Sequence, residues 1–207
     1  MGSSPLALTE IPVQTGIFIL SGTNMEKTIF IISGMSLPSE TTEQLSLIAC
    51  KHSLMAHYVE LHEGTVEGCR SCGKCIKRHK CMFDDVNQAI DISDNIVGIA
   101  IISPFYYGQP ASHVKRYLDR LFHSASDKFS YRPIVIYSYT RAVATTDPSV
   151  AFAPYITLSE LSLLDTGISR STTDHAQLYD LIDILCQSAQ SFELSNTPVQ
   201  RDFSFLR

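Results

Sequence analysis

One apolar stretch, Ile96 to Ile102, constrains the fold more than any other part of the chain. It reads IVGIAII and contains no polar side chain. A strand with one face in water carries polar residues at alternate positions, whereas a continuous apolar run of this length is typical of a strand buried on both faces. Such strands occur in parallel sheets that helices cover on each side, so the sequence predicts an α/β fold.

The segments around this strand alternate between strand and helix patterns. Further strands are expected over 28–33, 57–61 and 133–137, and helices over 41–52, 84–92, 110–122 and 173–189. In the less regular C-terminal third we expect a short helix over 158–164 and a weak strand over 167–169. In sheets built this way, ligands bind beyond the carboxyl ends of the strands. The loops after Ser33, Ser103 and Tyr139 are therefore the expected site.

The first 26 residues do not fit this alternation. The segment 17–22 reads IFILSG and nearly repeats IFIISG at 29–34, but only the second copy leads into a helix pattern. We interpret residues 1–26 as an N-terminal extension that was added or misassigned before Met25, with a β-hairpin between the two copies as the alternative. Residues 27–191 are predicted to form one domain, and residues 192–207 an irregular tail.

Composition narrows the class of protein. The chain has 207 residues, 44 % of them hydrophobic, and a net charge of −5, so it can bury one core and has no overall attraction for nucleic acid or anionic lipid. No apolar run reaches the roughly 18 residues of a membrane span, and the N-terminus lacks the pattern of a secretion signal. We therefore expect a cytoplasmic protein that binds neither nucleic acid nor membrane. The glycine motifs of dinucleotide-binding and P-loop folds are missing.

Four of the six cysteines lie within residues 68–81, which read GCRSCGKCIKRHKC. The spacing of Cys69, Cys72, Cys75 and Cys81 is C-x2-C-x2-C-x5-C, which favours a [4Fe–4S] cluster because one short loop then supplies neighbouring corners. Structural zinc more often uses two cysteine pairs about a dozen residues apart. A redox dithiol needs only two cysteines. Free or redox-active thiols and zinc remain open alternatives.

The basic residues among these cysteines have two interpretations. Cations lower the pKa of neighbouring thiols, offset the charge of a ligated cluster and attract an acidic partner. Alternatively, the loop is simply exposed and solvated. The two remaining cysteines, Cys50 and Cys186, lie on helix patterns and are expected to be small buried hydrophobic residues.

Two loops carry candidate binding groups. The hydroxyl-rich segment 33–42 leads into a helix N-terminus, whose unpaired N–H groups suit a phosphate; the alternative is a plain loop with Thr41 or Thr42 as helix cap. The segment 103–110, SPFYYGQP, places three aromatic rings after the most buried strand. These rings either form the wall of a flat, π-rich ligand site or close the core.

The run Ser-Pro-Phe-Tyr-Tyr-Gly at 103–108, followed by Lys115 and Asp119-Arg120, resembles the NAD(P)H-dependent FMN reductase and iron–sulfur flavoprotein branch of the flavodoxin-like proteins. The cysteine run, which continues to Asp84-Asp85, resembles the cysteine segment of the same branch. The resemblance covers about residues 28–122. It implies a flavodoxin-like, doubly wound parallel sheet of about five strands in three αβα layers, with a divergent C-terminal part.

Carried over position by position, the resemblance implies two groups of FMN-binding residues. Those around the phosphate are Gly34, Ser36, Ser39, Thr41 and Thr42. Those bordering the isoalloxazine are Pro104, Phe105, Tyr106, Tyr107 and Gly108. Lys115 and the Asp119-Arg120 pair are expected to hold the fold or a subunit contact.

The chain departs from the family pattern at three places. The phosphate-loop arginine of the family is replaced by Leu37, and the asparagine before the helix threonine by Thr41. The glycine-rich turn after the fourth strand is replaced by residues 139–142, where Thr140 and Arg141 complete the expected cofactor site. Arg141 would then supply the charge that the phosphate loop lacks.

The resemblance implies an FMN-dependent oxidoreductase that takes electrons from NAD(P)H as co-substrate and passes them to a small acceptor. The cofactor carries the redox chemistry, so no catalytic side chain is required. A [4Fe–4S] cluster would relay single electrons to a partner such as ferredoxin. The resemblance also implies a homodimer or homotetramer with flavin sites near subunit contacts. The alternative is a flavodoxin-fold protein without flavin activity, whose cysteine loop binds zinc or a partner.

Overall fold

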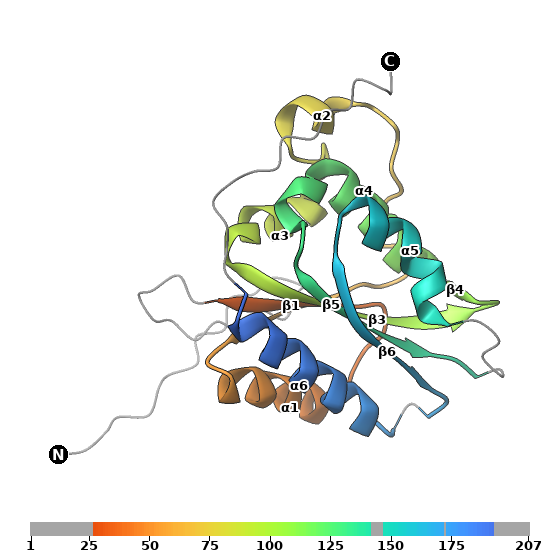
Figure 1. Cartoon of the computed structure of the whole chain (residues 1–207). Helices are drawn as coiled ribbons and strands as arrows, with labels where there is room; N and C mark the ends of the chain where they lie inside the picture. Colours follow the sequence, from red (N-terminus) through yellow and green to blue (C-terminus); the bar gives the residue numbers. More distant parts are fainter. Residues whose placement is uncertain (1–26, 142–146, 172, 193–207) are drawn as a thin grey trace.

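The computed structural model describes residues 27–141, 147–171 and 173–192 (Figure 1). The predicted N-terminal extension or hairpin lies outside these residues, as does the predicted tail beyond Phe192. Among the described residues, no helix is both long and apolar enough to cross a membrane.

The core of the fold is a five-stranded parallel sheet in the order β2-β1-β3-β5-β6. Its strands are β1 (Thr28–Ser33), β2 (Met55–Glu60), β3 (Ile96–Tyr106), β5 (Pro133–Tyr139) and β6 (Ser162–Ser169). A sixth, two-residue strand, β4 (Gln109–Pro110), pairs antiparallel with the end of β3. All residues of β3 before Tyr106 are buried, which confirms the prediction from its apolar run.

Helices cover both faces of the sheet and complete the three layers (Figure 1). One face carries α1 (Ser39–Lys51) and α6 (Ala176–Gln190). The other carries α3 (Asn87–Asp91), α4 (Ser112–Ala125) and α5 (Pro148–Leu158), and the short α2 (Lys74–Arg78) lies outside α4. Short 3-10 turns occupy Asp84–Val86, Ser93–Asn95 and Ser126–Phe129.

Each face of the sheet has its own hydrophobic core because successive strand residues point to opposite sides. In β1, Phe30 and Ile32 belong to the core under α3, α4 and α5, whereas Ile29 and Ile31 belong to the core under α1 and α6. Cys186 is buried in the second core, as expected. Cys50 is exposed, so the prediction for it was wrong. The inward face of α1 is formed by Leu45, Ile48 and Ala49, and the next residue points outward.

The helix predicted over 158–164 is wrong. The chain there leaves α5 at Leu158 and enters the edge strand β6 at Ser162. The 11 residues of α5, PSVAFAPYITL, include no charged side chain and have Pro154 inside the helix, so they show no polar face to mark a helix. Its start is instead set by Asp147, whose carboxylate accepts a hydrogen bond from the backbone N–H of Ser149 at 2.8 Å.

The loop after β1 packs tightly against the start of α4 through Gly34. The backbone N–H of Gly34 donates to the carbonyl of Ile102 (2.8 Å), and its own carbonyl accepts a hydrogen bond from His113 Nε2 (2.8 Å). A Cβ atom at this position would lie 2.2 Å from Val114 Cγ2. Only glycine therefore allows this close approach between the loop and the helix.

Replacing Gly34 by alanine is expected to destabilise the protein, because the added methyl group has to displace Val114 from a well-packed core. We expect the free energy of unfolding to fall by about 1–3 kcal/mol, measured by urea denaturation. Gly68→Ala is the matched control, since a Cβ there meets nothing within 4 Å. Equal unfolding midpoints for the two variants would contradict this account of the loop.

Candidate functional site

The loop after β1 forms the first wall of the site. Ser33 Oγ donates to the carbonyl of Met35 (2.7 Å) and accepts from its N–H (3.3 Å), which fixes the turn that follows the strand. Leu37 is buried in the core under α1 and α6. The position where the resembled family has an arginine thus contributes packing and no charge.

The N-terminus of α1 carries the hydroxyl groups that the sequence pointed to. The helix begins after Pro38, and no side chain caps it, so neither Thr41 nor Thr42 is the cap considered from the sequence. The first N–H groups of a helix have no partner inside it. The Thr42 hydroxyl donates to the carbonyl of Ser39 at 2.9 Å, whereas Thr41 is buried. This end of α1 therefore offers neutral donors for an anionic group.

Two carboxylates lower the anion affinity of this end. Glu40 lies in the first turn of α1. Glu60, at the end of β2, accepts a hydrogen bond from Ser36 Oγ at 2.5 Å and lies 3.2 Å from His62 Nε2. Ser39 and Thr42 also line a hollow between α1 and β2, together with Glu60 and His62. A phosphate here would be held by neutral groups close to negative charge.

The loop after β3 forms the second wall. Pro104 and Phe105 are buried, and the Phe105 ring packs on Phe152 with centroids 5.9 Å apart, so this ring closes the core. Tyr106 is 63 % exposed and Tyr107 fully exposed. Tyr107 and Gly108 have φ angles of 53° and 75°, which reverse the chain into β4. Two of the three predicted aromatic rings are thus free to contact a ligand.

The third loop is described only at its start. The N–H of Thr140 donates to the carbonyl of Ser169 at 3.0 Å, which ties the end of β5 to β6. Thr140 is buried and Arg141 is exposed. Residues 142–146 lie outside the described part of the chain, and Arg141, the predicted cation, is the last residue described before them.

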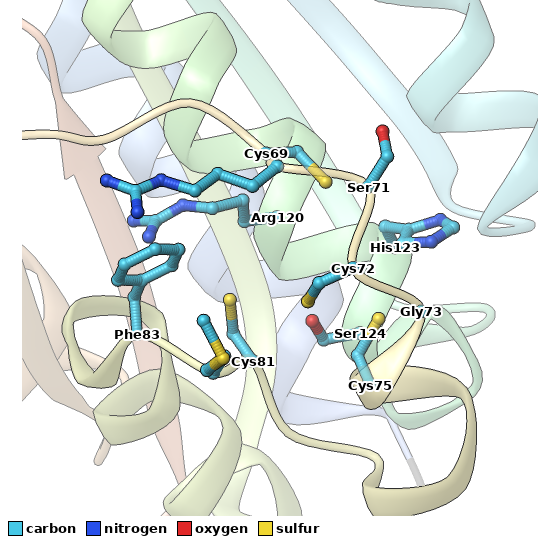
Figure 2. Close-up of a pocket in the computed structure, with 12 residues that line it drawn as sticks. Cys69, Ser71, Cys72, Gly73, Cys75, Cys81, Phe83, Arg120, His123 and Ser124 are labelled. Carbon is cyan, nitrogen blue, oxygen red and sulfur yellow. The ribbon is translucent and has the colours of Figure 1, made fainter.

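The four clustered cysteines line a single pocket beside α4, which encloses a cavity of about 20 Å³ (Figure 2). Cys69 and Cys72 come from the loop after β2 and are exposed, Cys75 lies in α2 and is buried, and Cys81 precedes the 3-10 turn at Asp84–Val86. Figure 2 shows their side chains around one space, with Phe83 and Arg120 at one side and His123 at the other. Among the described residues, no three His, Cys, Asp or Glu side chains are placed to bind one metal ion.

This arrangement bears on which metal the cysteines suit. Zinc–sulfur bonds of about 2.3 Å require ligand sulfurs about 3.8 Å apart around one ion. In a [4Fe–4S] cluster each cysteine binds a different iron, so the sulfurs surround a larger volume. The four thiols share one pocket, and thiolate ligands suit an iron–sulfur cluster and zinc alike.

Asn87 fixes the position of Cys81. Its Oδ1 accepts from the N–H of Cys81 (2.8 Å), and its Nδ2 donates to the carbonyl of Cys81 (3.1 Å) and to Asp84 Oδ1 (3.1 Å). Asn87 is buried in the first turn of α3. The fourth cysteine is therefore held by the helix that follows it, even though its loop is largely exposed.

Arg120, which the sequence predicted to hold the fold or a subunit contact, also lines this pocket. Its side chain is 1 % exposed, its Nη2 donates to Asp85, and its guanidinium lies 5.4 Å from the centre of the Phe83 ring. Among the described residues, Nε and Nη1 have no hydrogen-bond partner. Burial lowers the pKa of Arg120, and the neighbouring Cys81 and Cys69 act in the opposite direction. Each buried donor left unpaired costs about 1–3 kcal/mol.

The other residues of that motif have the structural role expected of them. Lys115 forms an ion pair with Asp119 at 2.8 Å, and Tyr155 of α5 donates to the same carboxylate at 2.5 Å. Burial raises the pKa of Tyr155 to about 12, so its hydroxyl stays protonated and serves as a fixed donor. These contacts join α4 to α5.

The comparisons with known proteins support the fold. No family model matches the chain, and no curated protein matches it. Solved structures do match. A flavone reductase is 11 % identical with a TM-score of 0.62, and the match covers 79 % of this chain and 63 % of the reductase. An oxidoreductase from Corynebacterium diphtheriae (12 % identity, TM-score 0.51) is matched over 81 % of this chain and 97 % of its own, and a flavodoxin from the domain Archaea (9 % identity, TM-score 0.51) over 79 % and 99 %. The chain thus spans 63 % of the length of the flavone reductase. At these identities the likeness concerns the fold alone, and that fold is flavodoxin-like.

Proposed function

We propose that this chain binds FMN at the carboxyl edge of β1 and β3 and acts as a flavin-dependent oxidoreductase. The observation that carries the proposal is that two features follow the carboxyl ends of the adjacent strands β1 and β3, namely the uncapped start of α1 and the exposed Tyr106–Tyr107 turn. The chain passes from β1 to α1 on one face and from β3 to α4 on the other (Figure 1). Adjacent strands whose connections leave in opposite directions create the crevice where doubly wound folds bind ligands.

The described residues fit FMN in their donors and their aromatic surface. The free N–H groups of the first turn of α1 and the hydroxyls of Ser39 and Thr42 would hold the phosphate, while Tyr106 and Tyr107 would contact the isoalloxazine. The loop before α1 and the first turn of α1 contain no cation, since Leu37 is buried and Glu40 and Glu60 are acidic, so a charge-assisted contact would have to come from Arg141 after β5. We therefore expect FMN to bind weakly enough to exchange.

FMN, when bound, would supply the redox chemistry by accepting two electrons and a proton from NAD(P)H and returning the electrons to an acceptor. The protein needs to orient the ring and leave one side open. The exposure of Tyr106 and Tyr107 suits such access by a nicotinamide and by a small acceptor in turn.

The cysteine pocket supports a finer proposal, a [4Fe–4S] cluster that relays single electrons to an external partner. Cys69, Cys72, Cys75 and Cys81 would each bind one iron. The exposed cations of the same loop, such as Lys77 and Arg78, would favour an acidic partner of the ferredoxin type. Helix α4 contacts both proposed cofactor sites. His113 contacts the loop after β1, and Arg120 borders the cysteine pocket about 10 Å further along the helix.

We also propose that the chain acts as a homo-oligomer in the cytoplasm. Exposed apolar side chains lie on α5, namely Val150 at 62 % and Leu158 at 71 %. This helix contacts β4, which follows the Tyr106–Tyr107 turn. A second copy covering α5 would therefore also approach the proposed flavin.

One set of observations favours a second candidate, a flavodoxin-fold protein that binds no flavin and uses its cysteine loop for zinc or a partner. The absence of a described cation at the start of α1 and the nearby Glu40 and Glu60 support it. FMN binding separates the two candidates directly.

Tyr106→Ala is expected to weaken FMN binding about fivefold, because losing one ring contact costs about 1 kcal/mol. The measurement is a titration of FMN with the full chain, followed by quenching of flavin fluorescence. Tyr131→Ala is the control, as Tyr131 is similarly exposed (53 %) but precedes β5 at the opposite edge of the sheet. Failure of the unaltered chain to bind FMN, or an equal loss in both variants, would reject the proposed site.

Cys72→Ala is expected to abolish iron–sulfide absorption in anaerobically purified protein while leaving FMN affinity unchanged, because it removes one ligand at a distance from the flavin. Iron, zinc and acid-labile sulfide would be measured together with the spectrum. Cys50→Ala, an exposed cysteine outside the pocket, is the control. Unaltered iron and sulfide in Cys72→Ala would exclude it as a ligand, and zinc without sulfide in the unaltered chain would favour the second candidate.

A further inference from the structure

The buried guanidinium of Arg120 needs an explanation that the fold does not supply. A charged side chain on the inward stripe of α4, close to Tyr117 and Leu121, is costly unless its donors are used. Asp85 accepts a hydrogen bond from Nη2 of Arg120 alone. The Phe83 ring lies beside the guanidinium but is not a hydrogen-bond acceptor for Nε or Nη1. Within the described residues, two donors of a fully buried cation therefore remain unused.

The pocket itself indicates what those donors are for. Arg120 lines the same space as the four cysteines, with its guanidinium beside Phe83 at one side of that space (Figure 2). Thiolates bound to iron are strong hydrogen-bond acceptors and carry negative charge. A guanidinium fork offers directional donors that a lysine ammonium does not.

We propose that Arg120 is a positioning residue that donates hydrogen bonds to cluster-ligating thiolates, Cys81 first, and thereby raises the reduction potential of a [4Fe–4S] cluster in this pocket. This inference rests on the cluster of the proposed function. Hydrogen bonds and positive charge near cluster sulfurs stabilise the more negative, reduced state. Asp85 acts in the opposite sense, because its carboxylate partly neutralises the guanidinium.

The test uses the full chain, purified without oxygen and reconstituted with ferrous iron and sulfide. Arg120→Lys keeps the charge but loses the planar fork, and Arg120→Met removes both. Each is expected to hold about four iron atoms per chain and to show a lower midpoint potential in a dye-mediated titration with dithionite, Arg120→Met the lower of the two. Asp85→Asn is expected to raise the potential. Arg116→Met, an exposed arginine one turn earlier on α4, is the matched control and should leave it unchanged.

The opposite signs expected for Arg120 and Asp85 distinguish this role from a purely structural one, since disruption of the pocket would move both variants the same way. If circular dichroism shows that Arg120→Met does not fold, Arg120→Lys and Asp85→Asn still give the direction in which the midpoint potential changes. If the iron-loaded variants have the same midpoint potential as the unaltered chain, the role of Arg120 is overturned, but the proposed cluster is not. An unaltered chain that takes up no iron and sulfide would overturn both.

Discussion

The structure depends on the burial of β3 between two layers of helices. Its apolar residues serve both cores at once, with Ile99 and Ile101 on one side and Ala100 and Ile102 on the other. Because its neighbours β1 and β5 are parallel to it, their carboxyl ends emerge at the same edge. The proposed flavin site exists because the loops after β1 and β3 meet there, held together by the close contact between Gly34 and α4.

Helix α4 links this edge to the cysteine pocket. Its first turn contacts the loop after β1, and its last turns supply Arg120, His123 and Ser124 to the pocket. A rigid helix thus fixes the distance between two sites whose own loops are exposed. If both cofactors bind as proposed, this helix would set the path for electrons between them, and Arg120 would set how readily the cluster accepts them.

Sequence patterns predicted the parts of the fold that rest on local periodicity. The strand at 28–33 has the predicted ends, and α4 follows from its apolar stripe, although it begins after Pro110, which lies in β4. In the segment 148–169, only the end of β6 was predicted as a strand, over 167–169. Helix α5 was missed because it has no charged side chain to mark a polar face, and the start of β6 was predicted as a helix. At the site, Tyr106 is exposed because β3 continues past Pro104, where its pairing with β5 ends, whereas the Phe105 ring packs on Phe152. Arg120 was expected to hold the fold, but its place beside the cysteines was not predicted, because its partner Asp85 lies 35 residues away in the chain.

The central claim is that FMN binds at the carboxyl edge of β1 and β3, and amide chemical shifts measured by nuclear magnetic resonance test it most directly. On addition of FMN to the isotope-labelled full chain, the account predicts saturable shifts for Ser39, Glu40 and Thr41 in the first turn of α1 and for Tyr106 to Gly108 after β3. The chemical shifts of the amides around Tyr131, at the opposite edge of the sheet, should not change. No shifts with FMN, or shifts confined to the cysteine loop, would contradict the account.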